Sequence, residues 1–356
     1  MPSPIRIDIP NVVYEVTIRC YQERFLLRPS EELNKLIWGA FGRAQALYPD
    51  IRLYDLVAES NHYHALVSST DGASRSLFFQ YVNHRISFEA GRLHGWKGGI
   101  FCRPARPIAC VTHEDQLHRF RYLRSHGVKE NLVARAAEWP GVSALPCLRA
   151  GKEISGTFLW HDQATKAQRR AKGKPIDLRA FEEQYPVRFS KLPALEHLSW
   201  EEIHRYTDDL TRDIEDEFDA KRIHPPLGRQ AILAQDPLDR PRKSKRSPAP
   251  PVHCADPGLR FRFCRMTKAL TDALRAANRS LQQGVRDIIF PPFCHPTRLP
   301  YSSWEDVQSQ SGTTGFVGLD IARETHSEHP AHETEANGPP SLLELLEDFG
   351  QCHLPI

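Results

Sequence analysis

The order of strand and helix patterns along the first 126 residues restricts the fold of this chain more than any other feature. Segments rich in β-branched and aromatic residues predict strands, and segments with apolar residues at helical spacing predict helices. In chain order they predict strand, helix, strand, strand, helix, strand and helix over residues 12–20, 30–47, 52–58, 63–69, 73–93, 107–111 and 113–126. A β-α-β-β-α-β order is that of the ferredoxin-like split βαβ domain, so the sequence predicts an α+β protein.

Helix-capping signals support this division. Thr112 with Asp115 forms a capping box at the start of the last helix in this segment, and Gly127 predicts its end. A second capping box, Ser199 with Glu202, predicts another helix in the later part of the chain.

The first candidate site is the pair His62 and His64, at the start of the second strand of the predicted hairpin. Alternate side chains of a strand point to the same side, so the two imidazoles share one face. Two neutral imidazoles at this spacing suit a divalent cation, which can polarise a phosphoryl oxygen. On spacing alone, an incidental pair of histidines is the alternative interpretation.

The second candidate site lies on the helix that ends this segment. Tyr122 and His126 are four residues apart and share a helix face. A tyrosine hydroxyl can attack a phosphodiester, but its ordinary pKa of about 10 means that it needs help from a metal or base. Arg119, Arg121 and Arg124 add positive charge where a phosphate backbone would need it. The alternative makes Tyr122 a half-buried core residue and His126 a cation favoured at the helix end.

The charge distribution points to a polyanionic partner. The chain has 47 basic and 44 acidic residues. The segment from Ser302 to the end contains ten of the acidic residues and only one of the basic residues, so the rest of the chain carries a net charge of +12. Nucleic acid is the first candidate for such a surface, and a basic surface with no particular partner is the other.

In this order and spacing the motifs resemble the HUH single-tyrosine transposases. His62-Tyr63-His64 resembles their His-hydrophobic-His signature, and Asn61 before it resembles the repetitive-element-associated (REP-associated) branch. The spacing to Tyr122, the run over 122–133 and the segment 139–143 are similar as well. The resemblance covers residues 10–145.

The resemblance implies metal-dependent cleavage and rejoining of single-stranded or hairpin DNA through a 5′-phosphotyrosine intermediate. Tyr122 would be the nucleophile, and His62 and His64 would bind Mg²⁺ or Mn²⁺. His126 would be the third ligand, at a position where the family commonly has Asn or Gln. Two or three imidazoles suit Mn²⁺ better than Mg²⁺. A homodimer is an option that the resemblance leaves open.

We divide the chain into five parts on composition and pattern. They are an HUH-type catalytic domain at 1–148, a basic accessory region with a helix at 149–235, a Pro/Arg-rich linker at 236–257, an amphipathic basic helix region at 258–300 and an acidic tail at 301–356. The extension beyond the first domain is predicted to be mainly helical and basic. The tail has the composition of a disordered segment.

The predicted helix after residue 258 carries a basic face with two interpretations. Its apolar face contains Leu259, Phe263, Met266, Leu270, Leu274, Ala277 and Leu281. The remaining surface carries Arg260, Arg262, Arg265, Lys268, Arg275 and Arg279. These charges indicate either a solvated face, which we prefer on sequence alone, or a helix that follows a phosphate backbone.

Three aromatic residues of the first domain also have two interpretations. Tyr63, Trp96 and Trp139 are either base-stacking or core residues.

Two other functions fit the same motifs. The first is a sequence-specific DNA-binding protein derived from a transposase that has lost catalysis. The second is a metal-dependent phosphodiesterase that uses water, with Tyr122 as a structural residue. Replacing Tyr122 by Phe separates them, because only a tyrosine nucleophile would lose cleavage while binding is retained.

No run of about 18 apolar residues occurs, and the N-terminal residues lack a secretory pattern, so we expect a cytoplasmic protein without a membrane partner. The eight cysteines are scattered without a Cys-x-x-Cys pair. Reduced thiols are therefore expected, and a zinc finger is not.

Overall fold

The computed structural model describes residues 9–70, 72–172, 174–241, 249–286, 288 and 290–291, and the predicted acidic tail lies outside them. The chain forms two compact units. One consists of Val13–Ser69 and Ser74–Ala249, and the other contains the helix α8 (Pro257–Gln282). The predicted α+β class is confirmed.

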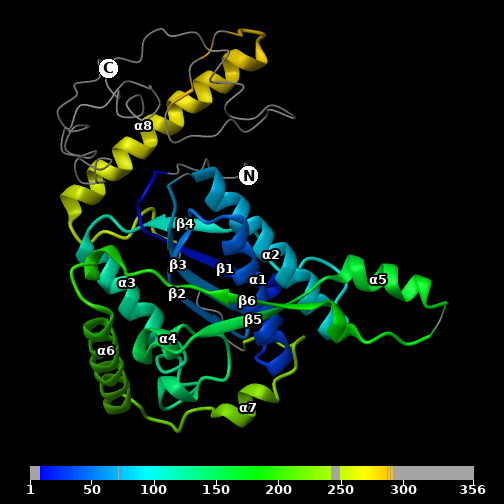
Figure 1. Cartoon of the computed structure of the whole chain (residues 1–356). Helices are drawn as coiled ribbons and strands as arrows, with labels where there is room; N and C mark the ends of the chain where they lie inside the picture. Colours follow the sequence, from blue (N-terminus) through cyan, green and yellow to red (C-terminus); the bar gives the residue numbers. More distant parts are fainter. Residues whose placement is uncertain are drawn as a thin grey trace, which may run out of the picture. The chain divides into compact units, whose positions relative to one another are not determined.

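A four-stranded antiparallel sheet is the frame of the first unit (Figure 1). Its strands are β1 (Tyr14–Arg19), β2 (Arg52–Glu59), β3 (His62–Ser68) and β4 (Arg106–Ala109), in the order β2-β3-β1-β4. The helix α1 (Glu31–Leu47) connects β1 to β2, and α2 (Gly72–His94) connects β3 to β4. This is the predicted ferredoxin-like split βαβ topology.

Helices cover both faces of this sheet. On one face the Tyr63 ring packs edge-on against Phe41 of α1, with ring centres 5.8 Å apart. On the other face Leu66 is buried with Phe120 and Leu123 of the helix α3 (His113–Ser125). Successive residues of β3 therefore face different helices, and His62 and His64 lie on the side of α3.

The predicted cap residues set the ends of the helices. Ser30 accepts a hydrogen bond from the Leu33 backbone N–H, and Thr112 and Asp115 form the predicted capping box. The helix α3 ends at Ser125, and Gly127 has a φ of 84°, which favours glycine. His126 is therefore the C-cap residue of α3.

An antiparallel hairpin that the sequence patterns did not predict packs on α1. Its strands are β5 (Ile154–Leu159) and β6 (Glu182–Val187), joined through α5 (His161–Arg170). Gly39 of α1 and Gly156 of β5 meet backbone to backbone, since a Cβ atom on either would clash with the main chain of the other element. The close contact of helix and hairpin thus depends on two glycines.

Replacing Gly156 by Ala should lower the free energy of unfolding by about 1–3 kcal/mol, because the new methyl group would force β5 away from α1. Gly99→Ala is the control, since its added Cβ would make only ordinary contact with the Phe101 carbonyl. Urea denaturation measures both variants. Equal stability of the two would show that the hairpin does not depend on this contact.

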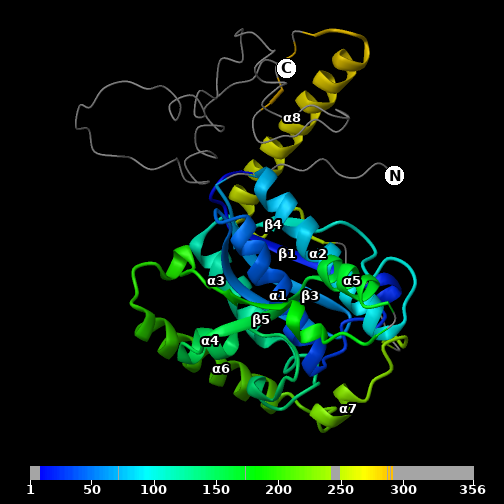
Figure 2. The ribbon, with the colours of Figure 1, turned by 45° about the vertical axis from the view of Figure 1, so that its right-hand side comes forward.

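Four further α-helices occur in the described part of the chain. They are α4 (Leu145–Ala150), α6 (Trp200–Ala220), α7 (Arg229–Leu233) and α8 in the second unit. The predicted capping box of Ser199 and Glu202 starts α6, which lies beside α4 (Figure 2). Among the described helices, none combines the length and the apolar character needed to cross a bilayer.

Candidate metal and tyrosine site

Three histidines from two elements converge beside the sheet. His62 and His64 come from β3, and His126 is the C-cap of α3. The ring centre of His64 lies 4.9 Å from that of His62 and 4.6 Å from that of His126. One nitrogen from each ring lies within 4.8 Å of the other two, so a single metal ion can be held by all three.

The Nδ1 atoms of the two strand histidines are held by neighbouring side chains. His62 Nδ1 lies 2.6 Å from the Asn61 side-chain oxygen. His64 Nδ1 lies 2.7 Å from the Glu15 carboxylate and 2.9 Å from the Thr17 hydroxyl, both on β1. Because a carboxylate only accepts hydrogen bonds, Glu15 favours the tautomer of His64 that carries its proton on Nδ1. That tautomer leaves Nε2 with a free lone pair.

His126 is held in the same way from a different strand. Its Nδ1 lies 3.2 Å from the carboxylate of Glu59, at the end of β2. Within the described residues, the Nε2 atoms of His64 and His126 are buried and have no hydrogen-bond partner. Buried polar atoms are rarely left unpaired, and metal-binding histidines usually have their other nitrogen held by a carboxylate or carbonyl. The residues present therefore fit a bound metal ion.

Burial keeps these imidazoles neutral. It lowers the pKa of His64 to about 4 and that of His126 to about 4, and it lowers the pKa of His62 well below the ordinary range. A metal ion binds the neutral form of histidine. At neutral pH all three nitrogens are ready to coordinate without first losing a proton.

Metal affinity should therefore persist in mild acid. A proton and a metal ion compete for the same nitrogen, and the pKa values of His64 and His126 are about 4. We expect Mn²⁺ affinity at about pH 5 to remain within roughly threefold of its value at pH 7, and to fall as the pH approaches 4. Calorimetric titration across this range measures it. A steep loss between pH 7 and 6 would indicate ordinary, exposed histidines.

Tyr122 lies directly against the histidine cluster. Its ring centre is 4.8 Å from that of His126 and 5.6 Å from that of His64, both edge-on. The Arg119 guanidinium lies 3.8 Å from the ring centre, and the Lys129 ammonium lies 4.4 Å from it. The four residues that the sequence predicted for this site are thus brought together by the fold. Their roles as ligands and nucleophile stay predictions.

The environment of Tyr122 raises its pKa. Partial burial is the main cause, and the charge of Glu15 adds to it, while Arg119 acts in the opposite direction. The phenol is therefore protonated at neutral pH. As a nucleophile it would need positive charge close to its oxygen.

Glu15 connects the histidine cluster to the tyrosine, and sequence reasoning did not find it. One carboxylate oxygen contacts His64, and the other lies 2.8 Å from Arg119 Nε. Arg119 in turn lies against Tyr122. The available signal was the alternation of the polar residues Glu15, Thr17 and Arg19 with the apolar residues of the same strand. Such a pattern usually indicates a solvent-facing side, whereas here α3 covers it.

Replacing Glu15 by Gln should weaken Mn²⁺ binding roughly 10- to 100-fold. The neutral amide can donate as well as accept a hydrogen bond, so it no longer selects the His64 tautomer with the proton on Nδ1. Isothermal titration of the metal alone measures the change without DNA or catalysis. Glu31→Gln is the matched control, since Glu31 is exposed and pairs with Lys35 on the helix surface. Unchanged affinity in the Glu15 variant would remove Glu15 from the metal site.

A second group of possible ligands shares one histidine with the first. Oxygen atoms of Glu59 and Glu130 and a nitrogen of His126 also lie close enough to hold one ion. Both carboxylates accept a hydrogen bond from the Gly127 backbone N–H. Since they surround the Nδ1 side of His126, they orient this ring toward the other two histidines.

All three predicted phosphate-binding arginines form ion pairs within the protein, and the partner of Arg119 is Glu15. Arg124 is buried and forms an ion pair with the buried Asp55, so it cannot reach a DNA backbone. Arg121 pairs with Glu217 of α6 at 2.5 Å. The prediction was wrong for Arg124 because its helix face turns toward the core. Arg119 and Lys129 are the cations next to Tyr122.

Two of the three aromatic residues considered for base stacking belong to the core. Tyr63 is buried and donates a hydrogen bond to Asn83, and Trp139 is buried and donates one to the Ala58 carbonyl. Trp96 is partly exposed and packs near Tyr21, with ring centres 6.3 Å apart. Base stacking by Tyr63 and Trp139 is therefore excluded.

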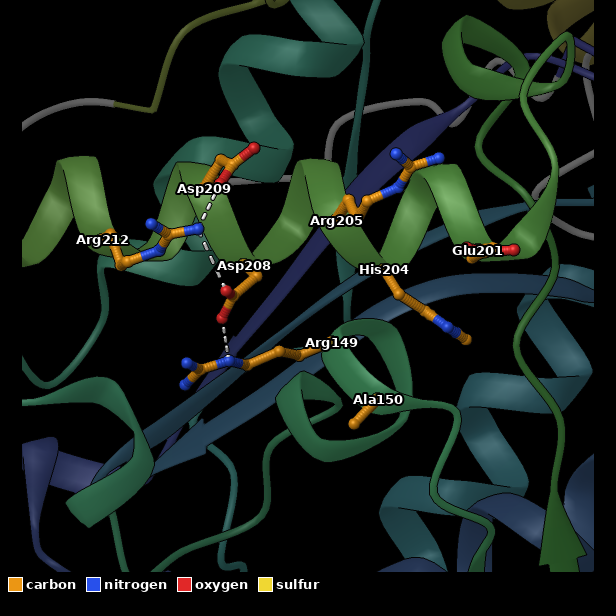
Figure 3. Close-up of a pocket in the computed structure, with 8 residues that line it drawn as sticks. All are labelled: Arg149, Ala150, Glu201, His204, Arg205, Asp208, Asp209 and Arg212. Carbon is orange, nitrogen blue, oxygen red and sulfur yellow. Dashed lines mark hydrogen bonds and ion pairs between the residues drawn. The ribbon is translucent and has the colours of Figure 1, made fainter.

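A cavity between α4 and α6 lies apart from these residues (Figure 3). It has a volume of about 460 Å³ and is lined by Arg149, Ala150, Glu201, His204, Arg205, Asp208, Asp209 and Arg212. Asp208 pairs with both Arg149 and Arg212, so much of the charge in this cavity is neutralised within the protein. The predicted site residues do not line it.

Comparison with protein-family models and with curated proteins gave no match. Among solved structures, the chain is similar to a REP-associated tyrosine transposase bound to a REP hairpin, with a TM-score of 0.35 and 15% sequence identity. The similarity covers 56% of this chain and 99% of that one.

Proposed function

We propose that this chain is a metal-dependent tyrosine transposase of the HUH type, which cleaves and rejoins single-stranded DNA. One observation carries the proposal. Tyr122 packs against His64 and His126, two members of the buried group of three histidines, and the Nε2 atoms of these two have no hydrogen-bond partner among the described residues. A tyrosine with only a structural role would not need three neutral histidines beside it that can bind a metal ion.

His62, His64 and His126 would hold the divalent cation. When bound, the cation polarises a phosphoryl oxygen and neutralises charge that develops there. Three imidazole nitrogens suit Mn²⁺ better than Mg²⁺, which prefers oxygen ligands. We therefore propose Mn²⁺ as the first ion to test and Mg²⁺ as the second.

The covalent step belongs to Tyr122. Its phenolic oxygen forms a bond to the scissile phosphorus as the bond from phosphorus to the 3′-oxygen breaks. The phenol loses its proton, the departing 3′-oxygen gains one, and the DNA 5′ end is held as a phosphotyrosine ester. Because one phosphate ester replaces another, a 3′-hydroxyl can reverse the step without a nucleotide cofactor.

Arg119 and Lys129 would place the phosphate beside the tyrosine. Both cations lie next to the ring, and Arg119 is held there by Glu15. Arg119 also acts to lower the Tyr122 pKa, which burial raises. Arg119 and Lys129 would therefore bind the DNA backbone and also activate the phenol.

The substrate we propose is single-stranded DNA, either alone or beside a hairpin. A phosphate at the Tyr122 hydroxyl must approach from the partly exposed side of α3, and an unpaired strand is flexible enough to do so.

Cytoplasmic localisation and homodimer formation stay predictions.

Incubation of end-labelled hairpin oligonucleotides with the protein and Mn²⁺ tests the proposal on a denaturing gel. We expect a slowly migrating protein–DNA band that disappears with chelator. Cleaved DNA without such a band would indicate a phosphodiesterase that uses water. DNA binding without cleavage would indicate a transposase-derived binding protein.

A further inference from the structure

The helix α8 carries an exposed, strongly basic surface that the proposed chemistry does not use. Its cationic residues are all exposed, and they are Arg260, Arg262, Arg265, Lys268, Arg275 and Arg279. Asp272 is the one acidic residue of the helix, so α8 has a net charge of +5. Its other side is apolar and contains the buried residues Phe263, Met266 and Leu274. The basic surface is therefore the side that remains free for a partner.

Four of these cations lie in one row, interrupted by Asp272, which we call the α8 stripe: Arg265, Lys268, Arg275 and Arg279. Their spacings of three, seven and four residues place them on one side of the helix. At 1.5 Å per residue the α8 stripe is about 21 Å long. Since it runs along the helix instead of gathering in the last turn, attraction to the helix dipole does not explain it.

The α8 stripe keeps an excess of positive charge, because two of its four cations share a single carboxylate and the other two have none among the described residues. Asp272 lies 2.7 Å from the Lys268 ammonium and 3.4 Å from the Arg275 guanidinium. Across the described part of the chain, Arg265 and Arg279 have no ion-pair partner. Ordinary solvated helix faces alternate their charges and pair them four residues apart. A face with so little acid repels itself unless a polyanion binds to it.

We propose that the α8 stripe binds the phosphate backbone of a duplex segment of the DNA substrate; this inference rests on the proposed function. Duplex DNA has a fixed line of phosphates with one charge per about 1.7 Å, and a straight cationic helix matches it. Surfaces for single strands add aromatic platforms, whereas only Phe261, which is 62% exposed, accompanies this row. A membrane partner would need the apolar face of α8, and that face is buried.

The test uses the full chain with all four stripe residues replaced by Gln, which favours helix and leaves the buried face unchanged. Binding to a 20-base-pair duplex with a single-stranded extension is measured as a function of salt. We expect affinity to fall at least about tenfold, and the slope of log K against log salt to decrease in magnitude by about three to four, close to 0.9 per lost contact. Circular dichroism checks that the helix content is retained.

A matched variant separates the α8 stripe from net charge. Replacing Lys166, Arg169, Arg170 and Lys172 by Gln removes the same four charges from the exposed surface in and after α5. We expect this variant to lose much less duplex affinity. Equal losses in the two variants, or an unchanged salt slope in the stripe variant, would overturn the proposal. Equal loss of binding to anionic lipid vesicles and to DNA would also overturn it, in favour of a non-specific cationic surface.

Failure of this inference can be told apart from failure of the proposed function. The stripe variant should still form the covalent adduct on a short single-stranded oligonucleotide, since that substrate has no duplex. Loss of duplex binding without any adduct in the unmodified protein would leave the α8 stripe as a DNA-binding surface and reject the tyrosine chemistry.

Discussion

Tyr122→Phe is expected to reduce formation of the protein–DNA adduct at least about a thousandfold, because the substitution removes the only oxygen that would attack the phosphate. The phenyl ring can keep its edge-on contacts with His64 and His126. We therefore expect affinities for Mn²⁺ and for DNA to stay within about twofold of those of the unmodified protein. Quantitative denaturing gels and metal titration measure both quantities.

Tyr206→Phe serves as the control for this substitution. Tyr206 packs against Phe120 with ring centres 6.4 Å apart and lies on α6, away from the histidines. Its variant should form the adduct at the normal rate. Cleavage that survives in the Tyr122 variant would mean that water or another residue is the nucleophile.

Arg124→Ala should lower the free energy of unfolding by about 3–5 kcal/mol, because it leaves the carboxylate of Asp55 buried without its partner. Burial already raises the pKa of Asp55 to about 6, and the charge of Arg124 opposes that rise. In the variant, Asp55 must take up a proton or remain as an unpaired charge. Chemical denaturation at neutral pH measures the loss.

Replacing both members of this buried pair tests the reason for the loss. The double variant Asp55→Leu with Arg124→Met removes both charges while keeping apolar volume, and we expect it to be much more stable than Arg124→Ala. If the double variant is as unstable as the single one, shape rather than charge would explain the effect. A loss below about 1 kcal/mol in Arg124→Ala would show that the pair is solvated.

The frame of the fold could be predicted because its signals are local. The residues that cap α1 and α3, Ser30 and Thr112, lie within three positions of the groups they bind. The alternation of β3 places His62 and His64 on one face, whatever packs there. Such patterns depend on near neighbours in the chain and can be read without a structure.

The β5–β6 hairpin could not be predicted from its own residues. Gly156 weakens the strand pattern of β5, and β6 begins with the exposed residues Glu182, Glu183 and Gln184. The hairpin is stabilised by packing on α1, where Gly39 permits close approach. That contact joins segments more than a hundred residues apart in the sequence.

The candidate site was predictable in its histidines and tyrosine but not in its supporting carboxylates. His62, His64, Tyr122 and His126 follow motif spacing, so the sequence alone pointed to them. Glu15 and Glu59 matter only because β1 and β2 flank β3 in the sheet. Strand order is a property of the assembled fold, which explains why these two residues were missed.

Intact-protein mass spectrometry after incubation with hairpin DNA and Mn²⁺ tests the tyrosine chemistry most directly. We expect a species heavier by the mass of the DNA fragment that carries the cleaved 5′ phosphate. Protease digestion should place this addition on the peptide that contains Tyr122. Cleaved DNA with unmodified protein, or an addition on another residue, would contradict the proposed mechanism.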